Sequence, residues 1–83
     1  SDHDEVNVIR MERVPYMDQS GLYALEEVVF ELDQKGVAVV LTDAGVQPLD
    51  MMRQVQLVPD IVPEEQCFDT FGEFVEWLKQ QKA

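Results

Sequence analysis

One stretch of the chain predicts its architecture: VNVIRMERVPYMDQSGLYALEEVVFELDQKGVAVVLT, residues 6–42. Its first part, residues 6–11, is short, rich in β-branched side chains and followed by the turn residue Pro15, so it predicts a strand. Its last part, residues 37–42, is a nearly continuous apolar run, which is typical of a central strand covered on both faces. Both strands are therefore expected to lie in one sheet.

The segment between these strands, residues 21–34, predicts an amphipathic helix. Its apolar side chains recur at helical spacing: Leu22, Leu25, Val28, Val29 and Leu32. Ser20 is the expected N-cap residue, and Gly36 is expected to end the helix in a left-handed conformation. A strand, a helix and a second strand in this order form a βαβ unit, so the two strands should run parallel with a right-handed crossover.

The remainder of the chain predicts two more helices and one further strand. Residues 42–45 read as a loop, and Pro48 suits the first turn of a short helix whose inward residues are Leu49, Met52 and Val55. Residues 57–62 are expected to form a brief edge strand that prolines limit. A final helix over residues 69–80 is expected to begin with a capping box and to bury one apolar face, made of Phe71, Phe74, Val75 and Leu78.

Three strands are few for such a sheet, since sheets commonly contain about four to six strands. We therefore expect residues 1–83 to form a single α/β domain that is the carboxyl-terminal part of its fold, with the first, amino-terminal strands absent from this chain. The expected architecture is a mixed, mostly parallel sheet flanked by helices.

The composition excludes several classes of partner. Seventeen Asp and Glu residues against six Lys and Arg give a formal charge of −11, which repels nucleic acid and anionic lipid surfaces. The single cysteine, Cys67, excludes an intramolecular disulfide and is expected to be a small packing residue. The acidic start, residues 2–5, is expected to be solvated and not to bind metal. No apolar run approaches the roughly 20 residues that span a bilayer, so the chain itself is expected to be soluble.

The turn between the first strand and the helix carries the strongest functional signal. It places Asp-x-Ser-Gly, residues 18–21, at a helix amino terminus, where unpaired N–H groups favour an anion. Loops that follow neighbouring parallel strands share one sheet edge, so residues 42–45 should lie beside this turn. The candidate partner-binding and regulatory edge therefore consists of Asp18, Gln19, Ser20, Gly21, Thr42 and Asp43. A purely structural role, with Ser20 as a cap and Asp18 as a turn residue, remains open at this point.

Catalysis is not expected. The one histidine, His3, lies in the acidic start, and the chain has neither a Ser-His-Asp or Cys-His arrangement nor a glycine-rich phosphate loop. We therefore expect no enzymatic activity, no cofactor and no metal. Weak nucleotide binding by the two loops is an alternative against which the acidic charge argues.

The turn and the segments after it resemble the STAS domain. The resemblance spans residues 6–78, and its motifs are residues 14–25 together with Gln47-Pro48-Leu49-Asp50-Met51-Met52 and Leu57-Val58-Pro59, which are most similar to bacterial SulP-type anion permeases. STAS domains normally begin with two further strands and usually a helix, which this sequence lacks. The resemblance implies a mixed sheet flanked by helices.

The same resemblance implies a non-catalytic regulatory and interaction domain at the cytoplasmic face of the inner membrane, within a secondary transporter for sulfate or a related anion. Its implied partners are the transmembrane part of that transporter and a soluble regulatory protein. Copies of the domain could also form a homo-oligomer through the transporter. In a second branch of the family, the anti-sigma factor antagonists, the serine that corresponds to Ser20 is phosphorylated. A free-standing antagonist switched by phosphorylation of Ser20 is therefore the alternative.

Overall fold

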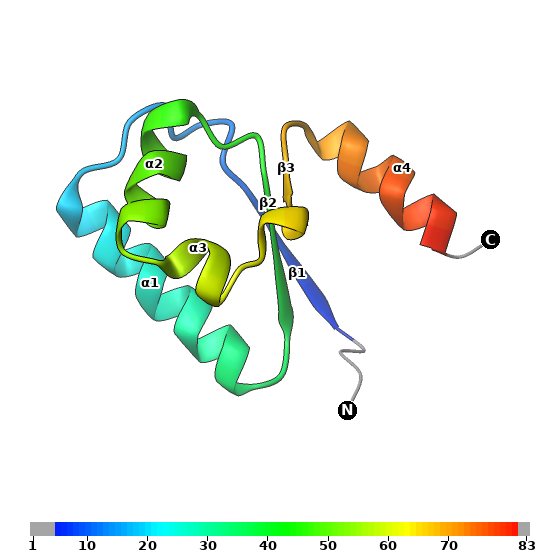
Figure 1. Ribbon diagram of the computed structural model, residues 1–83, viewed down its shortest axis with the longest axis horizontal. Coiled ribbons are helices and arrows are strands. Elements are labelled where there is room, and N and C mark those ends of the chain that lie inside the picture. Colours follow the sequence, from blue (N-terminus) through cyan, green and yellow to red (C-terminus); the bar gives the residue numbers. More distant parts are fainter. Residues whose placement is uncertain (1–4, 82–83) are drawn as a thin grey trace.

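The computed structural model describes residues 5–81 and arranges them as a sheet between helices (Figure 1). The elements follow one another as β1 (Val6–Arg10), α1 (Gln19–Gln34), β2 (Ala38–Thr42), α2 (Val46–Gln54), α3 (Leu57–Asp60), the 3-10 turn η1 (Glu64–Gln66), β3 (Cys67–Phe68) and α4 (Phe71–Gln81). Helices α1, α2 and α3 lie on one side of the sheet and α4 on the other. None of the helices in this described part is long and apolar enough to cross a membrane.

The sheet has the strand order β1-β2-β3, and both pairings are parallel. Strand β2 is central, as its continuous apolar sequence predicts, and the register runs from Val6 beside Ala38 to Arg10 beside Thr42. The predicted strand–helix–strand unit and the α/β fold class are therefore confirmed.

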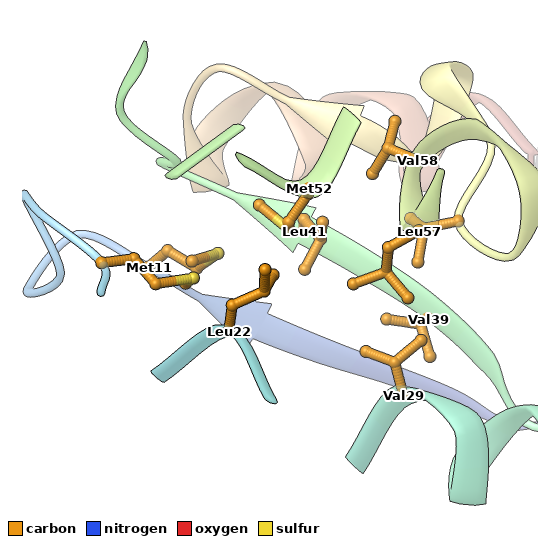
Figure 2. Close-up of a cluster of buried hydrophobic side chains, with 10 residues drawn as sticks. Met11, Leu22, Val29, Val39, Leu41, Met52, Leu57 and Val58 are labelled. Carbon is orange, nitrogen blue, oxygen red and sulfur yellow. The ribbon is translucent and has the colours of Figure 1, made fainter. Parts of the chain in front are cut away.

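The hydrophobic core lies between the sheet and helices α1, α2 and α3 (Figure 2). Leu22 and Val29 on α1 point toward Val39 and Leu41 on β2, and Met52 closes the cluster from α2. Complete burial of one such side chain stabilises the fold by about 1.5–3 kcal/mol. This layer is consequently the main source of stability.

The other face of the sheet packs against α4 through aromatic rings. Val40 and Thr42 alternate with the core residues of β2 and are buried on this face. The ring of Phe74, on α4, meets that of Phe68 edge-on at 5.5 Å between centroids. The Glu73 N–H donates to Thr70 Oγ1 at 3.1 Å, which is one of the two hydrogen bonds of the capping box predicted at the start of this helix.

Two predictions between residues 55 and 62 are wrong. Val55 is exposed because α2 ends at Gln54. Residues 57–62 form a helical turn with a cis Val58–Pro59 bond instead of an edge strand. Leu57, Val58 and Val62 are all buried in one core, whereas a strand would point the adjacent residues 57 and 58 to opposite faces. The third strand is the two-residue β3, which the sequence pattern does not predict.

Candidate functional site

The turn before α1 is built around an aspartate cap. The helix begins at Gln19, and Asp18 Oδ1 accepts a hydrogen bond from the Gly21 N–H at 2.8 Å. The prediction that Ser20 is the N-cap is therefore wrong, because the helix starts two residues earlier than its apolar pattern suggests. Ser20 lies instead in the first turn of α1 with its side chain exposed.

A glutamine side chain holds this turn against the next helix. Gln47 Oε1 accepts from the Met17 N–H at 2.7 Å, and Gln47 Nε2 donates to the Met17 carbonyl oxygen at 2.8 Å. Both backbone groups of Met17 are thus satisfied by one side chain of α2, 30 residues further along the chain. The sequence does not predict this role, since a glutamine in a first helical turn gives no local signal for a distant partner.

The second loop of the site follows β2 and lies beside the first. A side-chain carbon placed on Gly45 would sit 3.8 Å from the carbonyl oxygen of Pro15, in the β1–α1 connection. Asp43 has a left-handed backbone conformation, with φ of 62°, and its N–H donates to the Phe68 carbonyl oxygen at 3.1 Å. The two loops thus meet at the edge where parallel strands end.

The six candidate residues differ in solvent exposure and fall into three groups. Asp18, Gln19, Ser20 and Gly21 are exposed, Asp43 is half-buried, and Thr42 is completely buried. A partner that docks at this edge would not reach the Thr42 side chain, which corrects its place in the candidate surface. Thr42 Oγ1 and Asp43 Oδ2 are both buried without a hydrogen-bond partner among the described residues.

The electrostatics of the turn do not suit an incoming anion. The helix amino terminus attracts negative charge, but the carboxylate of Asp18 already supplies that charge and takes the Gly21 N–H. The ion pairs within residues 5–81 all lie elsewhere: Arg10 with Glu12, Lys35 with Glu31, Arg53 with Glu64 and Lys79 with Glu76. Weak nucleotide binding therefore stays a prediction without support from this geometry.

An apolar groove of about 450 Å³ runs beside the outer edge of β1 and under the start of α1. Its apolar lining includes Ile9, Met11, Val14, Met17, Leu25 and Val28. The Met11 N–H donates to the Thr42 carbonyl oxygen, and the Glu5 carbonyl oxygen accepts from the Ala38 N–H. Because backbone groups alternate in direction along a strand, the odd-numbered residues of β1 direct their N–H and C=O groups toward β2. The backbone groups of Val6, Val8 and Arg10 consequently point outward to this unpaired edge.

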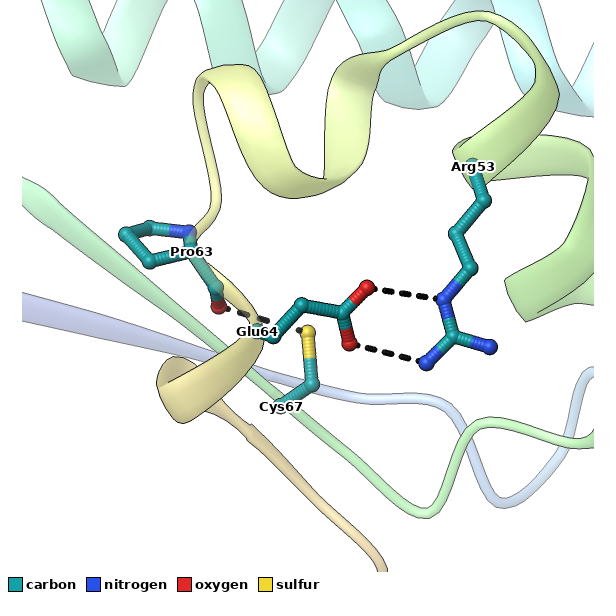
Figure 3. A network of polar contacts seen from close by, with 4 residues as sticks. All are labelled: Arg53, Pro63, Glu64 and Cys67. Atoms are coloured by element: carbon teal, nitrogen blue, oxygen red, sulfur yellow. Dashed lines mark hydrogen bonds and ion pairs between the residues drawn. The ribbon is translucent and has the colours of Figure 1, made fainter.

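Far from this edge, an ion pair fastens α2 to the segment before β3 (Figure 3). Arg53 donates through Nε and Nη2 to the two carboxylate oxygens of Glu64, at 2.9 and 2.8 Å. This hydrogen-bonded pairing lowers the pKa of Glu64 and raises the pKa of Arg53. The geometry is bidentate, which fixes the orientation of both side chains.

Cys67 lies next to this pair and is half-buried. Its thiol donates to the Pro63 carbonyl oxygen at 3.6 Å. Burial, with the neighbouring Glu64 charge, raises the pKa of the thiol to about 11. The side chain packs against the hydrophobic core, as the sequence predicts for a small apolar residue.

The described part of the chain offers no cluster of metal ligands, because no three His, Cys, Asp or Glu side chains within residues 5–81 are grouped to hold an ion. The predicted solvation of the acidic start falls mostly on residues 2–4, which lie outside the described residues. The sheet edge thus presents the exposed polar residues 18–21 on a turn that the Gln47 side chain holds in place.

Comparison with known proteins agrees with this fold. The sequence model of the STAS domain matches residues 2–74. Searches of the curated proteins and of the solved structures found no match.

Proposed function

Because this chain belongs to the STAS domain family, whose members are generally non-catalytic regulatory and interaction domains, we propose that it regulates a SulP-type anion transporter from the cytoplasmic face of the inner membrane. The observation that carries this proposal is the exposed turn of residues 18–21, which the Gln47 clamp on Met17 holds in a fixed position. A rigid turn with accessible polar groups can bind a partner without a large loss of conformational entropy.

The resemblance to permease domains supports the transporter as the parent protein. Its three motifs are separate in sequence, yet they come together in the fold. Gln47 of the second motif contacts Met17 of the first, and Met52 shares the core with Leu57 of the third. The similarity therefore covers a connected part of the structure.

The mechanism proposed is a shift between conformations of the transporter. The docking surface is Asp18, Gln19, Ser20 and Gly21, flanked by Asp43, and its partner is the membrane part of the transporter or a soluble regulatory protein. Binding changes transport only if the domain has different affinities for two transporter conformations. A coupling free energy of about 1 kcal/mol would change the equilibrium about fivefold.

A charge placed on this surface tests the proposal. In the full-length protein, Ser20→Glu should change the rate of labelled sulfate uptake about fivefold or more, while the neutral control Ser20→Gln should leave it near the parent value. Unchanged uptake and unchanged partner binding would contradict the docking surface. A parent reading frame without about ten or more apolar spans, each of about 20 residues, would contradict the transporter itself.

We also propose that the open edge of β1 belongs to a larger sheet, in which a preceding strand of the same domain pairs with it. The outward backbone groups of Val6, Val8 and Arg10 and the apolar groove beside them support this arrangement. Hydrogen exchange gives the test. The Val8 amide should exchange rapidly in residues 1–83 alone and slowly in the longer protein. Rapid exchange in both would exclude a pairing strand.

The alternative function, a free-standing antagonist switched at Ser20, is favoured by one observation: the Ser20 side chain is exposed in the first turn of α1. A phosphoryl group there would add about two negative charges beside Asp18 and so would more readily disrupt a contact than create one. Mass spectrometry of the protein from its native cells distinguishes the two functions, because the antagonist requires a phosphorylated fraction.

A further inference from the structure

The outward face of α1 has an unusual composition for a solvent-exposed surface. Helical geometry places Gln19, Ser20, Tyr23, Glu27 and Phe30 on one side, opposite the buried Leu22 and Val29. The aromatic rings are well exposed, at 57% for Tyr23 and 44% for Phe30. We call these five residues the outer α1 face. It begins within the proposed docking surface and continues two turns beyond it.

All the charged side chains of α1 are negative. The sequence of α1 is QSGLYALEEVVFELDQ, which contains four acidic residues and no Lys or Arg. Glu31 pairs with Lys35 at the end of the helix, whereas Glu27 lies between the two rings without an ion pair among the described residues. Rings and carboxylates that alternate on one surface suit cations, because ring faces and carboxylates both attract positive charge.

The same chemistry already occurs once inside this protein. The guanidinium of Arg10 lies 4.1 Å from the centroid of the Phe71 ring, and Arg10 Nε is 3.3 Å from the Glu12 carboxylate. One arginine is thus held by a ring and a carboxylate together. The outer α1 face presents the same two components, exposed rings and a carboxylate, on a helix that contains no Lys or Arg.

We propose that the outer α1 face binds an arginine- or lysine-rich segment whose basic side chains are about 10 Å apart, the rise of seven helical residues from Tyr23 to Phe30. This inference rests on the proposed function, since the cytoplasmic loops of membrane proteins carry an excess of Lys and Arg and would supply that segment. The charge of −11 makes these basic loops, and not the anionic lipid surface around them, the occupant.

A peptide titration tests the surface directly. The probe is a helical alanine-based peptide with Arg at two positions seven residues apart, titrated into residues 1–83 at low salt. The double variant Tyr23→Ser/Phe30→Ser should bind about tenfold more weakly, since two exposed cation–π contacts are lost. The matched control is Val46→Ser, which removes an 80% exposed apolar side chain from α2 and should leave binding unchanged.

Three outcomes would overturn the inference: equal affinity in the double variant and the parent chain, an equal loss in Val46→Ser, or binding to phosphatidylserine vesicles that survives the double substitution. Both aromatic positions are exposed, so the double variant should stay folded, and its circular dichroism spectrum confirms that. If the peptide binds as expected but the parent gene encodes no membrane spans, this basic-segment site stands and the transporter proposal fails.

Discussion

At the scale of single residues, the sequence correctly places a helix amino terminus at residues 18–21 but assigns the N-cap to Ser20 instead of Asp18. Both side chains can cap a helix, and the sequence alone does not fix which residue begins it. In the structure the carboxylate of Asp18 takes the Gly21 N–H, which leaves the Ser20 hydroxyl on the surface. This division of roles frees Ser20 for contact or modification without loss of the cap.

Replacing the two residues separately tests that division. Asp18→Ala should lower the free energy of unfolding by about 1 kcal/mol, the usual value of an N-cap, whereas Ser20→Ala should change it by less than about 0.5 kcal/mol. Urea denaturation monitored by circular dichroism measures both values. The reverse order would show that Ser20 is the cap after all.

Cys67 provides a second prediction at this scale. Because burial raises its pKa from 9.0 to about 11, the thiolate fraction at pH 7.5 should be about 100-fold smaller than that of an ordinary thiol, and alkylation by iodoacetamide should slow by the same factor. The rate should rise about tenfold for each pH unit up to the thiol pKa. The urea-unfolded chain is the control, and equal rates in both states would contradict the burial of this thiol.

At the scale of elements, the sequence predicts those that repeat a pattern and misses those that depend on tertiary contacts. Helices α1 and α4 are long enough for their apolar period to identify them, and strands β1 and β2 are identified by β-branched composition and by a continuous apolar run. Residues 57–62 have the composition of a strand, but their place at the core bends them into a turn. Two residues, as in β3, contain no period at all.

The Gln47 clamp joins two of these elements and has a testable effect. Gln47→Ala leaves both backbone groups of Met17 without their partner, which should cost about 1–3 kcal/mol of unfolding free energy and speed hydrogen exchange at the Met17 amide. Gln54→Ala, an exposed change at the other end of α2, is the matched control. An unchanged exchange rate at Met17 would show that the clamp does not hold the turn.

At the scale of the whole molecule, the fold explains why one part of the site was predictable and another was not. Parallel strands end at a common edge, so the sequence order alone placed residues 18–21 near residues 42–45. The burial of Thr42 was not predictable, because α4 returns from far along the chain to cover that face of the sheet. The exposure of Tyr23 and Phe30 likewise depends on which helices pack beside α1.

Crosslinking in living cells probes the function of this surface most directly. A photoreactive phenylalanine analogue at Gln19 in the full-length protein should form its crosslinks with an integral membrane transporter, or with the membrane-embedded part of its own polypeptide. The same analogue at Gln80, which is exposed on α4 at the other side of the sheet, should form few or none. Equal yields from both positions would contradict a docking surface at residues 18–21. Crosslinks from Gln19 to soluble proteins alone would leave a soluble regulatory protein as the partner and would contradict direct docking on a transporter.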